Sequence, residues 1–99
     1  MLTIRQKIVA IDSFRLDLPP TDNILFIRYV DRPGMIGIVG QTLGEAQINI
    51  AAMQVARSEA GGTALMALTV DSHVSEDIVG KVKKETNAEF VRSVFLVEK

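Results

Sequence analysis

The junction between a strand and a helix at residues 29–37, with the sequence YVDRPGMIG, constrains the fold of this chain more than any other segment. Before it, residues 24–27 are apolar and rich in β-branched and aromatic side chains, which is typical of a buried strand. After it, apolar residues recur at the spacing of a helix: Ile36, Val39, Leu43 and Ala46. Pro33 fixes its own φ without needing a partner for an amide, and Gly34 lets the backbone approach a neighbour closely. The segment therefore predicts a tight connection from a strand into a helix.

The start of this predicted helix is a candidate site for an anion. The backbone amides of Met35 and Ile36 follow Gly34, and amides in the first turn of a helix have no acceptor within the helix. A helix N-terminus also favours negative charge, so the carboxylate of a small ligand fits there. The residues alone therefore predict a small charged ligand at this connection.

Length and composition exclude several classes of protein. The 99 residues are enough for one domain with a modest two-layer core. With 11 basic and 12 acidic side chains the net charge is −1, which gives no reason to expect a nucleic-acid partner. The chain has no cysteine and a single histidine, His73, so we expect no disulfide, no metal site and no cofactor in this domain.

The hydropathy pattern predicts no membrane partner. No apolar run approaches the roughly 18 to 20 residues that cross a bilayer. Residues 1–5 also lack the long apolar core of a signal peptide. We therefore expect a soluble domain in the cytoplasm.

The first 22 residues are predicted to form a β-hairpin extension. The segments 7–11 and 14–18 flank a two-residue turn at Asp12 and Ser13, and the second segment alternates apolar and polar side chains. The following run of two prolines, threonine and aspartate at 19–22 stops regular structure. We therefore divide the chain into an extension at 1–22 and a domain at 23–99.

The rest of the chain predicts a ferredoxin-like α+β fold. Strands are expected near residues 23–30, 48–56, 63–70 and 89–97, and helices near 34–46 and 75–86. The order βαββαβ is that of a four-stranded antiparallel sheet with two helices on one face. In the strand at 63–70, the even-numbered apolar residues are expected to share one face, and Leu65 and Ala67 the other.

Motifs within this fold resemble the ACT domain, a small-molecule sensing module on enzymes of amino-acid metabolism. The resemblance rests on YVDRPG at 29–34, Gly44 in the helix, and QINI at 47–50. The segments DRPG at 31–34, VGQTLG at 39–44, INIA at 48–51 and MQV at 53–55 are similar to the C-terminal regulatory domain of D-3-phosphoglycerate dehydrogenase. The resemblance covers about residues 23 to 97. The hairpin before it resembles the tail of a preceding domain in longer family members.

The resemblance implies a regulatory domain without catalytic residues. It implies binding of L-serine, or another small amino acid, at the interface of a homodimer formed through ACT domains. The partner domains would be the catalytic part of an NAD-dependent phosphoglycerate dehydrogenase, an oxidoreductase of serine biosynthesis under feedback control.

The resemblance also assigns site residues. Asp31 takes the position that meets the ammonium group of the effector, Asn49 the position that contacts its amino-acid end across the interface, and Tyr29 a third lining position. With Gly34 and the amides of Met35 and Ile36 for the carboxylate, the chemistry is consistent, because a carboxylate attracts an ammonium group. Several family members have Asn and His where this chain has Asp31 and Tyr29, which leaves the choice of amino acid open.

Each of these residues also has a structural interpretation. Asp31 can cap the helix, Asn49 can shape the turn into the next strand, and Tyr29 can be a half-buried strand residue. Three glycines lie along one helical face, which favours close packing of a neighbouring element over a nucleotide loop: Gly37, Gly40 and Gly44.

Three alternative functions stay open at this point. Residues 53–59 follow the Met-x-Val-x-Arg-x-Glu pattern of the ACT domain in an iron–sulfur L-serine dehydratase subunit. A dimerisation module without a ligand would use only the structural roles above. An acylphosphatase-like enzyme would need Arg32 to point into the loop, with Asn49 as its second residue, and Pro33 would remove one of the amides that such a site requires.

Overall fold

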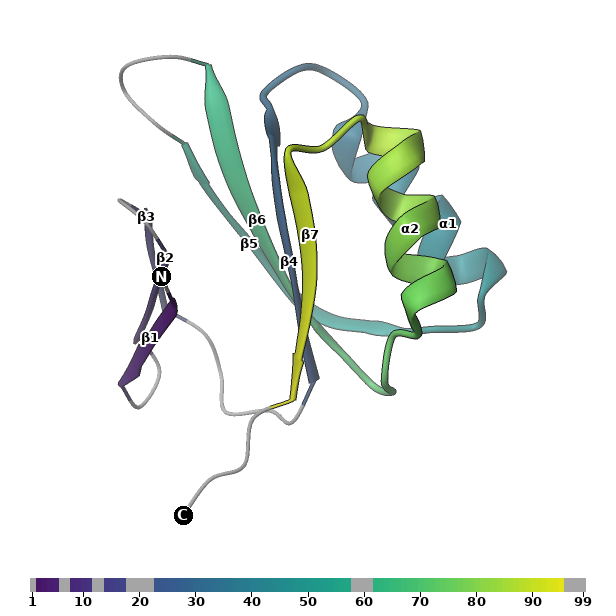
Figure 1. The fold of residues 1–99 in the computed structure, drawn as a ribbon, viewed down its shortest axis with the longest axis horizontal. Helices are drawn as coiled ribbons and strands as arrows, with labels where there is room; N and C mark the ends of the chain where they lie inside the picture. Colours follow the sequence, from purple (N-terminus) through teal and green to yellow (C-terminus); the bar gives the residue numbers. More distant parts are fainter. Residues whose placement is uncertain (1, 6–7, 12–13, 18–22, 58–61, 96–99) are drawn as a thin grey trace.

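From residue 23 the chain folds into a four-stranded antiparallel sheet with two helices packed on one face. The computed structural model describes residues 2–5, 8–11, 14–17, 23–57 and 62–95. From residue 23 the elements are β4 (Asn23–Val30), α1 (Met35–Glu45), β5 (Ile50–Arg57), β6 (Thr63–Val70), α2 (Glu76–Thr86) and β7 (Phe90–Phe95). The strands lie in the order β5-β6-β4-β7, all antiparallel, and both helices cover the same face (Figure 1). The predicted βαββαβ fold is therefore confirmed.

The main core lies between the helices and the sheet. As predicted, residues of β6 divide between the two faces of the sheet. Those facing the helices are Ala64, Met66, Leu68 and Val70. Leu65 and Ala67 belong to a second buried cluster with Ile24 and Phe26. Because β4 and β6 are the two central strands, their side chains are covered on both faces, which explains why both read as nearly continuous apolar runs.

The apolar residues that give α1 its helical spacing are not all buried. Val39 and Leu43 are fully buried, but Ile36 is 49% exposed. The helix begins at Met35, which takes the core position of the first turn. Ile36 lies beside this buried stripe, where it lines a pocket at the start of the helix.

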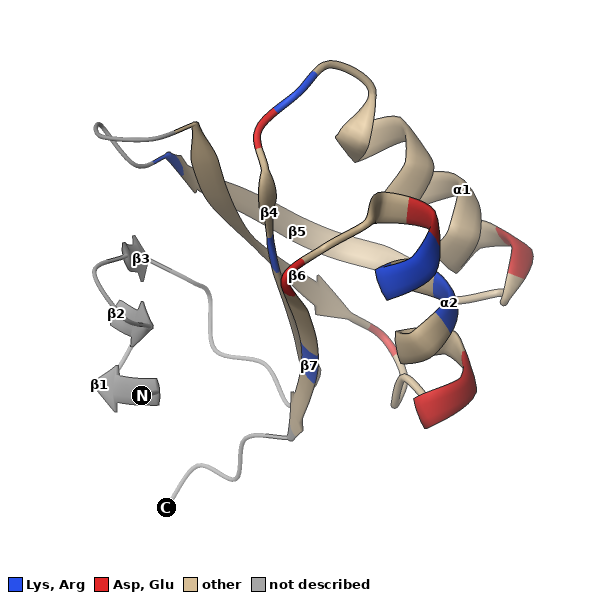
Figure 2. Ribbon diagram, turned by 45° about the horizontal axis from the view of Figure 1, so that its top comes forward, with Lys and Arg blue, Asp and Glu red and all other residues tan. Residues whose placement is uncertain are grey.

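The residue types of α2 account for its N-terminal cap and for its exposed face. The Ser75 hydroxyl accepts a hydrogen bond from the Ile78 amide at 3.4 Å, so Ser75 is the N-cap, as its residue type favours. Charges of both signs lie side by side along the exposed surface of α2 (Figure 2). One of them, Lys81, lies 3.9 Å from Glu45 at the end of α1. Exposed pairs of this kind add little stability, and this face of α2 is solvated.

Three short strands precede the main sheet. They are β1 (Leu2–Arg5), β2 (Ile8–Ile11) and β3 (Phe14–Asp17), and they form an antiparallel sheet in that order. This sheet lies on the side of β5 away from the helices (Figure 1). The turn at residues 12–13 and the boundary at 18–22 lie outside the described residues, so the hairpin extension and the domain division at residue 22 stay predictions.

Neither described helix has the length and apolarity that a membrane-spanning helix requires.

Candidate functional site

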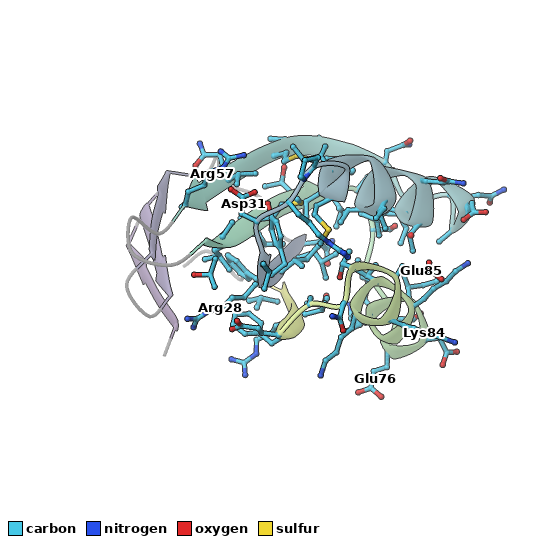
Figure 3. All side chains as sticks on the ribbon, turned by 90° about the horizontal axis from the view of Figure 1, so that it is seen from above. Arg28, Asp31, Arg57, Glu76, Lys84 and Glu85 are labelled. Atoms are coloured by element: carbon cyan, nitrogen blue, oxygen red, sulfur yellow. The ribbon has the colours of Figure 1, made fainter. Side chains whose placement is uncertain are left out.

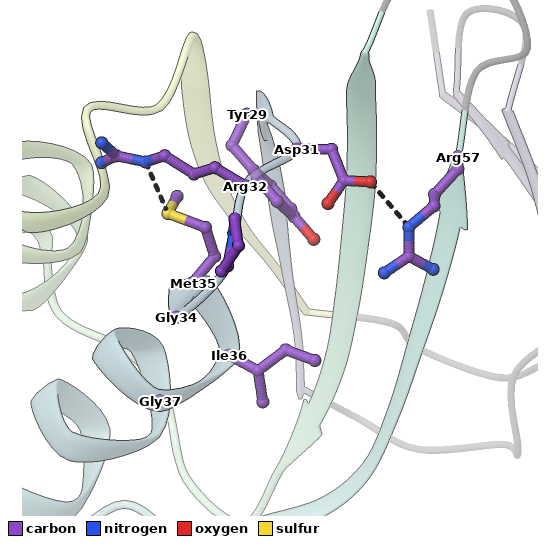
Figure 4. A pocket seen from close by; sticks show the side chains of 9 residues that line it. Tyr29, Asp31, Arg32, Gly34, Met35, Ile36, Gly37 and Arg57 are labelled. Carbon is purple, nitrogen blue, oxygen red and sulfur yellow. Dashed lines mark hydrogen bonds and ion pairs between the residues drawn. The ribbon is translucent and has the colours of Figure 1, made fainter.

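A pocket of about 410 Å³ lies where β4 passes into α1. It is bounded by the end of β4, the first turn of α1 and the end of β5 (Figure 4). Its lining residues are Tyr29, Asp31, Arg32, Pro33, Gly34, Met35, Ile36, Gly37 and Arg57. Five of the six residues predicted to bind a ligand are therefore brought together at one place.

The start of α1 leaves amide groups available to this pocket. Gly34 is the N-cap, with a left-handed φ of 89°, and no side chain forms a capping hydrogen bond. The first bond of the helix runs from the amide of Ile38 to the carbonyl of Gly34, at 3.1 Å. The amides of Met35 and Ile36 precede that bond and have no intrahelical acceptor. Helix capping by Asp31, the structural interpretation of that residue, is therefore wrong for this structure.

Asp31 instead forms an ion pair with Arg57, the last residue of β5. The Arg57 Nε donates to Asp31 Oδ2 at 2.7 Å (Figure 4). The Asp31 side chain is 28% exposed and that of Arg57 61% exposed, so the pair lies at the mouth of the pocket. The backbone of Asp31 is also fixed, because its amide donates to the Gly62 carbonyl at 2.6 Å.

Strand register explains why Arg57 reaches the pocket. Both Arg57 and Tyr29 are cross-strand partners of Ala64, on the two sides of β6. Side chains of directly opposed residues lie on the same face of a sheet, so Arg57 and Tyr29 both point toward the start of α1. The view from above shows Arg57 and Asp31 converging from different elements (Figure 3). The sequence contained Arg57 only as part of the pattern at 53–59, with no sign that it would join the site.

Tyr29 is both a core residue and a wall of the pocket. It is 2% exposed, and its hydroxyl forms no hydrogen bond within the described part of the chain. Burial raises the pKa of Tyr29, the nearby Asp31 carboxylate raises it further, and Arg57 partly offsets both effects. The hydroxyl is not among the fully buried side-chain atoms that lack a partner, so it is open to the pocket, where a water or a polar ligand atom can hydrogen-bond to it.

Arg32 points away from the pocket and toward α2 (Figure 4). Its Nε donates to Met35 Sδ at 3.2 Å, and its Nη2 donates to the carbonyl of Thr86 at 3.4 Å. Thr86 is the last residue of α2, where a cation is favoured by the helix dipole. The orientation needed for an acylphosphatase-like site is therefore not the one observed.

Asn49 lies apart from the pocket in this chain. It precedes β5, whereas Arg57 ends that strand, and eight residues of extended chain span roughly 25 Å. The Asn49 backbone amide and side-chain amide donate to the two carboxylate oxygens of Asp71, each at 3.1 Å. The expected contact of Asn49 with a ligand across a dimer interface stays a prediction.

The pocket combines groups for both signs of charge. Asp31 can attract a cation, while Arg57 and the amides of α1 can hold an anion. Among the residues that the structure describes, no three or more His, Cys, Asp or Glu side chains gather as they would around a metal ion.

Comparison with known proteins assigns the family. Residues 23–87 match the ACT domain family, which covers the βαββα part of the fold. The chain belongs to the ACT domain family. ACT domains bind small ligands such as amino acids, and in this ACT domain the family match includes every residue that lines the pocket.

Similar sequences occur in D-3-phosphoglycerate dehydrogenases. The Bacillus subtilis enzyme is 43% identical over 93 residues, or 94% of this chain, and the Methanocaldococcus jannaschii enzyme is 39% identical over 89 residues, or 90% of it. This ACT domain spans only 17% of the length of each of these enzymes. Among solved structures, the quorum-quenching acylase GqqA has a TM-score of 0.56 at 14% identity, over 81% of this chain and 47% of its own, which shows a shared fold only.

The glycine face of α1 has no packing partner among the described residues of this ACT domain. A Cβ atom built on Gly37, Gly40 or Gly44 would meet no described atom within 4 Å. Close packing by an element of the same chain, as far as it is described, therefore does not account for these glycines. They leave α1 open to close approach from outside the domain.

Proposed function

We propose that this ACT domain binds a small amino acid, L-serine first among them, and regulates a D-3-phosphoglycerate dehydrogenase by feedback. The NAD-dependent catalytic domains of that oxidoreductase would lie elsewhere in the parent enzyme, in the cytoplasm, and the ACT domain would need no cofactor of its own. The similarity to two such enzymes over at least 90% of this chain supports the choice of parent. The choice of serine rests on the family resemblance.

The observation that carries the amino-acid part is the meeting of opposite charges in one small pocket. Asp31 supplies a carboxylate, the start of α1 supplies amides, and the Tyr29 hydroxyl between them lacks a partner among the described residues. An amino acid presents an ammonium group and a carboxylate a few ångströms apart, so each end finds an opposite charge.

The pocket is completed, in this proposal, by a second copy of the domain. β5 is an edge strand of the described four-stranded sheet, and unpaired strand edges pair readily with another chain. The open glycine face of α1 lies next to the same pocket, since Gly37 belongs to both. A two-fold contact through α1 and β5 would use the same patch on both copies and would bring Asn49 of the second copy to the ligand.

Isothermal titration calorimetry with the common amino acids tests the function. L-serine should bind most tightly and glycine more weakly, because glycine lacks the side-chain hydroxyl. Binding of a different amino acid alone would keep the sensor and replace the ligand. No heat with any amino acid would favour a dimerisation module without a ligand.

A second candidate parent is an iron–sulfur L-serine dehydratase. The pattern of Met53, Val55 and Arg57 favours it, and Arg57 is now placed in the pocket. Serine binding does not separate the two parents. An assay of the full-length protein for phosphoglycerate oxidation and for serine deamination, each with and without serine, does.

A further inference from the structure

We infer that Arg57 binds the carboxylate of the amino acid, and that the Asp31–Arg57 pair makes the pocket select zwitterions over ligands with a single charge. This inference rests on the proposed amino-acid site. It adds a residue that neither the family motif nor the loop chemistry assigned, and it specifies the ligand class by its two charges.

The ion pair leaves ligand-binding atoms free on both partners. Only Arg57 Nε and Asp31 Oδ2 are joined, at 2.7 Å. Asp31 Oδ1 and the two terminal nitrogens of Arg57 form no hydrogen bond to the other described residues. A carboxylate has acceptor sites on both oxygens and a guanidinium has five N–H donors, so both groups can bind a ligand while the pair stays intact.

The geometry sets the direction of the ligand. Asp31 lies at the end of β4, and Arg57 faces the first turn of α1 across the pocket (Figure 4). A ligand carboxylate placed between Arg57 and the amides of Met35 and Ile36 has donors on two sides. Its ammonium group then extends toward Asp31 Oδ1, next to the Tyr29 hydroxyl. The ligand therefore lies beside the ion pair, with its carboxylate at Arg57 and its ammonium group at Asp31.

The same pair disfavours ligands with one charge. A protonated amine is attracted by Asp31 but repelled by Arg57 a few ångströms away. A ligand with only a carboxylate is attracted by Arg57 and repelled by Asp31. The two effects largely cancel for a single charge and add for a zwitterion. Burial is the main cause that raises the pKa of Tyr29, and the smaller effects of Asp31, which raises it, and Arg57, which lowers it, have the opposite signs expected of the two charges.

A ligand series on the full chain tests the two-charge requirement. L-serine, ethanolamine and N-acetyl-L-serine share the hydroxymethyl group, but ethanolamine lacks the carboxylate and N-acetyl-L-serine lacks the ammonium group. Each should bind at least about 10- to 100-fold more weakly than L-serine, because each loses a charge-assisted hydrogen bond. Ethanolamine or N-acetyl-L-serine binding as tightly as L-serine would overturn the inference.

Arg57→Gln and Arg57→Lys test the residue itself. Gln removes the charge and should weaken serine binding by a similar factor, whereas Lys keeps a point charge and should retain part of it. Arg92→Gln is the matched control, since Arg92 is an exposed arginine on β7 outside the pocket. Because the Asp31–Arg57 pair is exposed, all variants should stay folded, which circular dichroism checks.

The two proposals fail in different ways. Wild-type affinity in Arg57→Gln would remove Arg57 from the ligand and leave the amino-acid sensor in place. No binding of any amino acid by the wild-type chain would instead remove the sensor, and with it this inference. If the domain binds another amino acid instead of serine, the same ligand series is made from that amino acid, its decarboxylated amine and its N-acetyl derivative.

Discussion

Asp71 accepts two hydrogen bonds from Asn49, one from the backbone amide and one from the side-chain amide, and both measure 3.1 Å. The two residues are 22 positions apart in sequence, yet they join the start of β5 to the end of β6. These two hydrogen bonds, called the Asn49–Asp71 clasp below, hold the Asn49 side chain within the described part of the chain.

This clasp predicts a dependence of stability on acid. Hydrogen bonds, first that from the Asn49 backbone amide, lower the pKa of Asp71 below its ordinary value of 3.8. Since the ionised form is favoured in the folded state, the contribution is present above pH 3.8 and is lost as pH falls through the lower folded-state pKa. Urea unfolding between pH 6 and 2 should show a smaller loss of stability in Asp71→Asn than in the wild type. If the free energy of unfolding falls equally steeply with pH in both proteins, the Asn49–Asp71 hydrogen bonds do not form in solution.

Substitution of Asp31 should separate stability from ligand binding. Because Asp31 does not cap α1, Asp31→Ala should cost about 0–1 kcal/mol of apo stability, as for other exposed ion pairs, and a loss near the upper end of the 0.5–2 kcal/mol range typical of a lost cap is not expected. The ligand-induced stabilisation, about 2.7 kcal/mol at 100 times Kd, should disappear. Asp31→Asn should keep part of it, since the amide oxygen still accepts. Thermal unfolding of each variant with and without L-serine measures both quantities.

Thermal unfolding with and without L-serine also tests the role of Asn49, through the variant Asn49→Ala. Loss of the serine-induced shift would place Asn49 at the ligand through a second copy of the domain. Wild-type shifts in both Asp31→Ala and Asn49→Ala would eliminate these two residues as ligand contacts.

Tyr29→Phe should change the alkaline limit of stability with little cost at neutral pH. The Tyr29 hydroxyl has no hydrogen bond among the described residues, so its removal should alter stability by less than about 1 kcal/mol at pH 7. The raised pKa of Tyr29 means that wild-type stability falls as pH rises above 10.0 through the folded-state pKa. Chemical unfolding from pH 9 to 11 should therefore show that the free energy of unfolding falls with pH in the wild type more than in Tyr29→Phe.

Substitution of a glycine on α1 tests the proposed dimer. Gly44→Leu adds a side chain to the open face and should weaken self-association by about tenfold or more, through overpacking. Gly80→Leu is the control, because Gly80 is an exposed glycine in α2 with equally open surroundings. Analytical ultracentrifugation gives the dissociation constant of each. A monomeric wild type at high concentration, with and without serine, would rule out the dimer.

The sequence predicted most of the fold because its signals are local. Alternation in β6 and helical spacing around Val39 and Leu43 each follow from a few neighbouring residues. The same holds for the pocket residues at 29–36, which are contiguous in the chain.

Arg57 was missed for a different reason. Its contact with Asp31 spans 26 residues and depends on two strand registers, that of β5 with β6 and that of β6 with β4. Neither register follows from residue types alone. The same limit applies to Asn49, whose partner Asp71 is set by the end of β6.

Arg32 gives the pocket a property beyond its charge pattern. Its guanidinium links the loop before α1 to Met35 on one side and to the end of α2 on the other. A loop held at both helices has few conformations to lose when a ligand arrives. That loop loses most of its conformational entropy when the domain folds. Less of the interaction free energy with a small ligand is therefore needed to order the loop on binding.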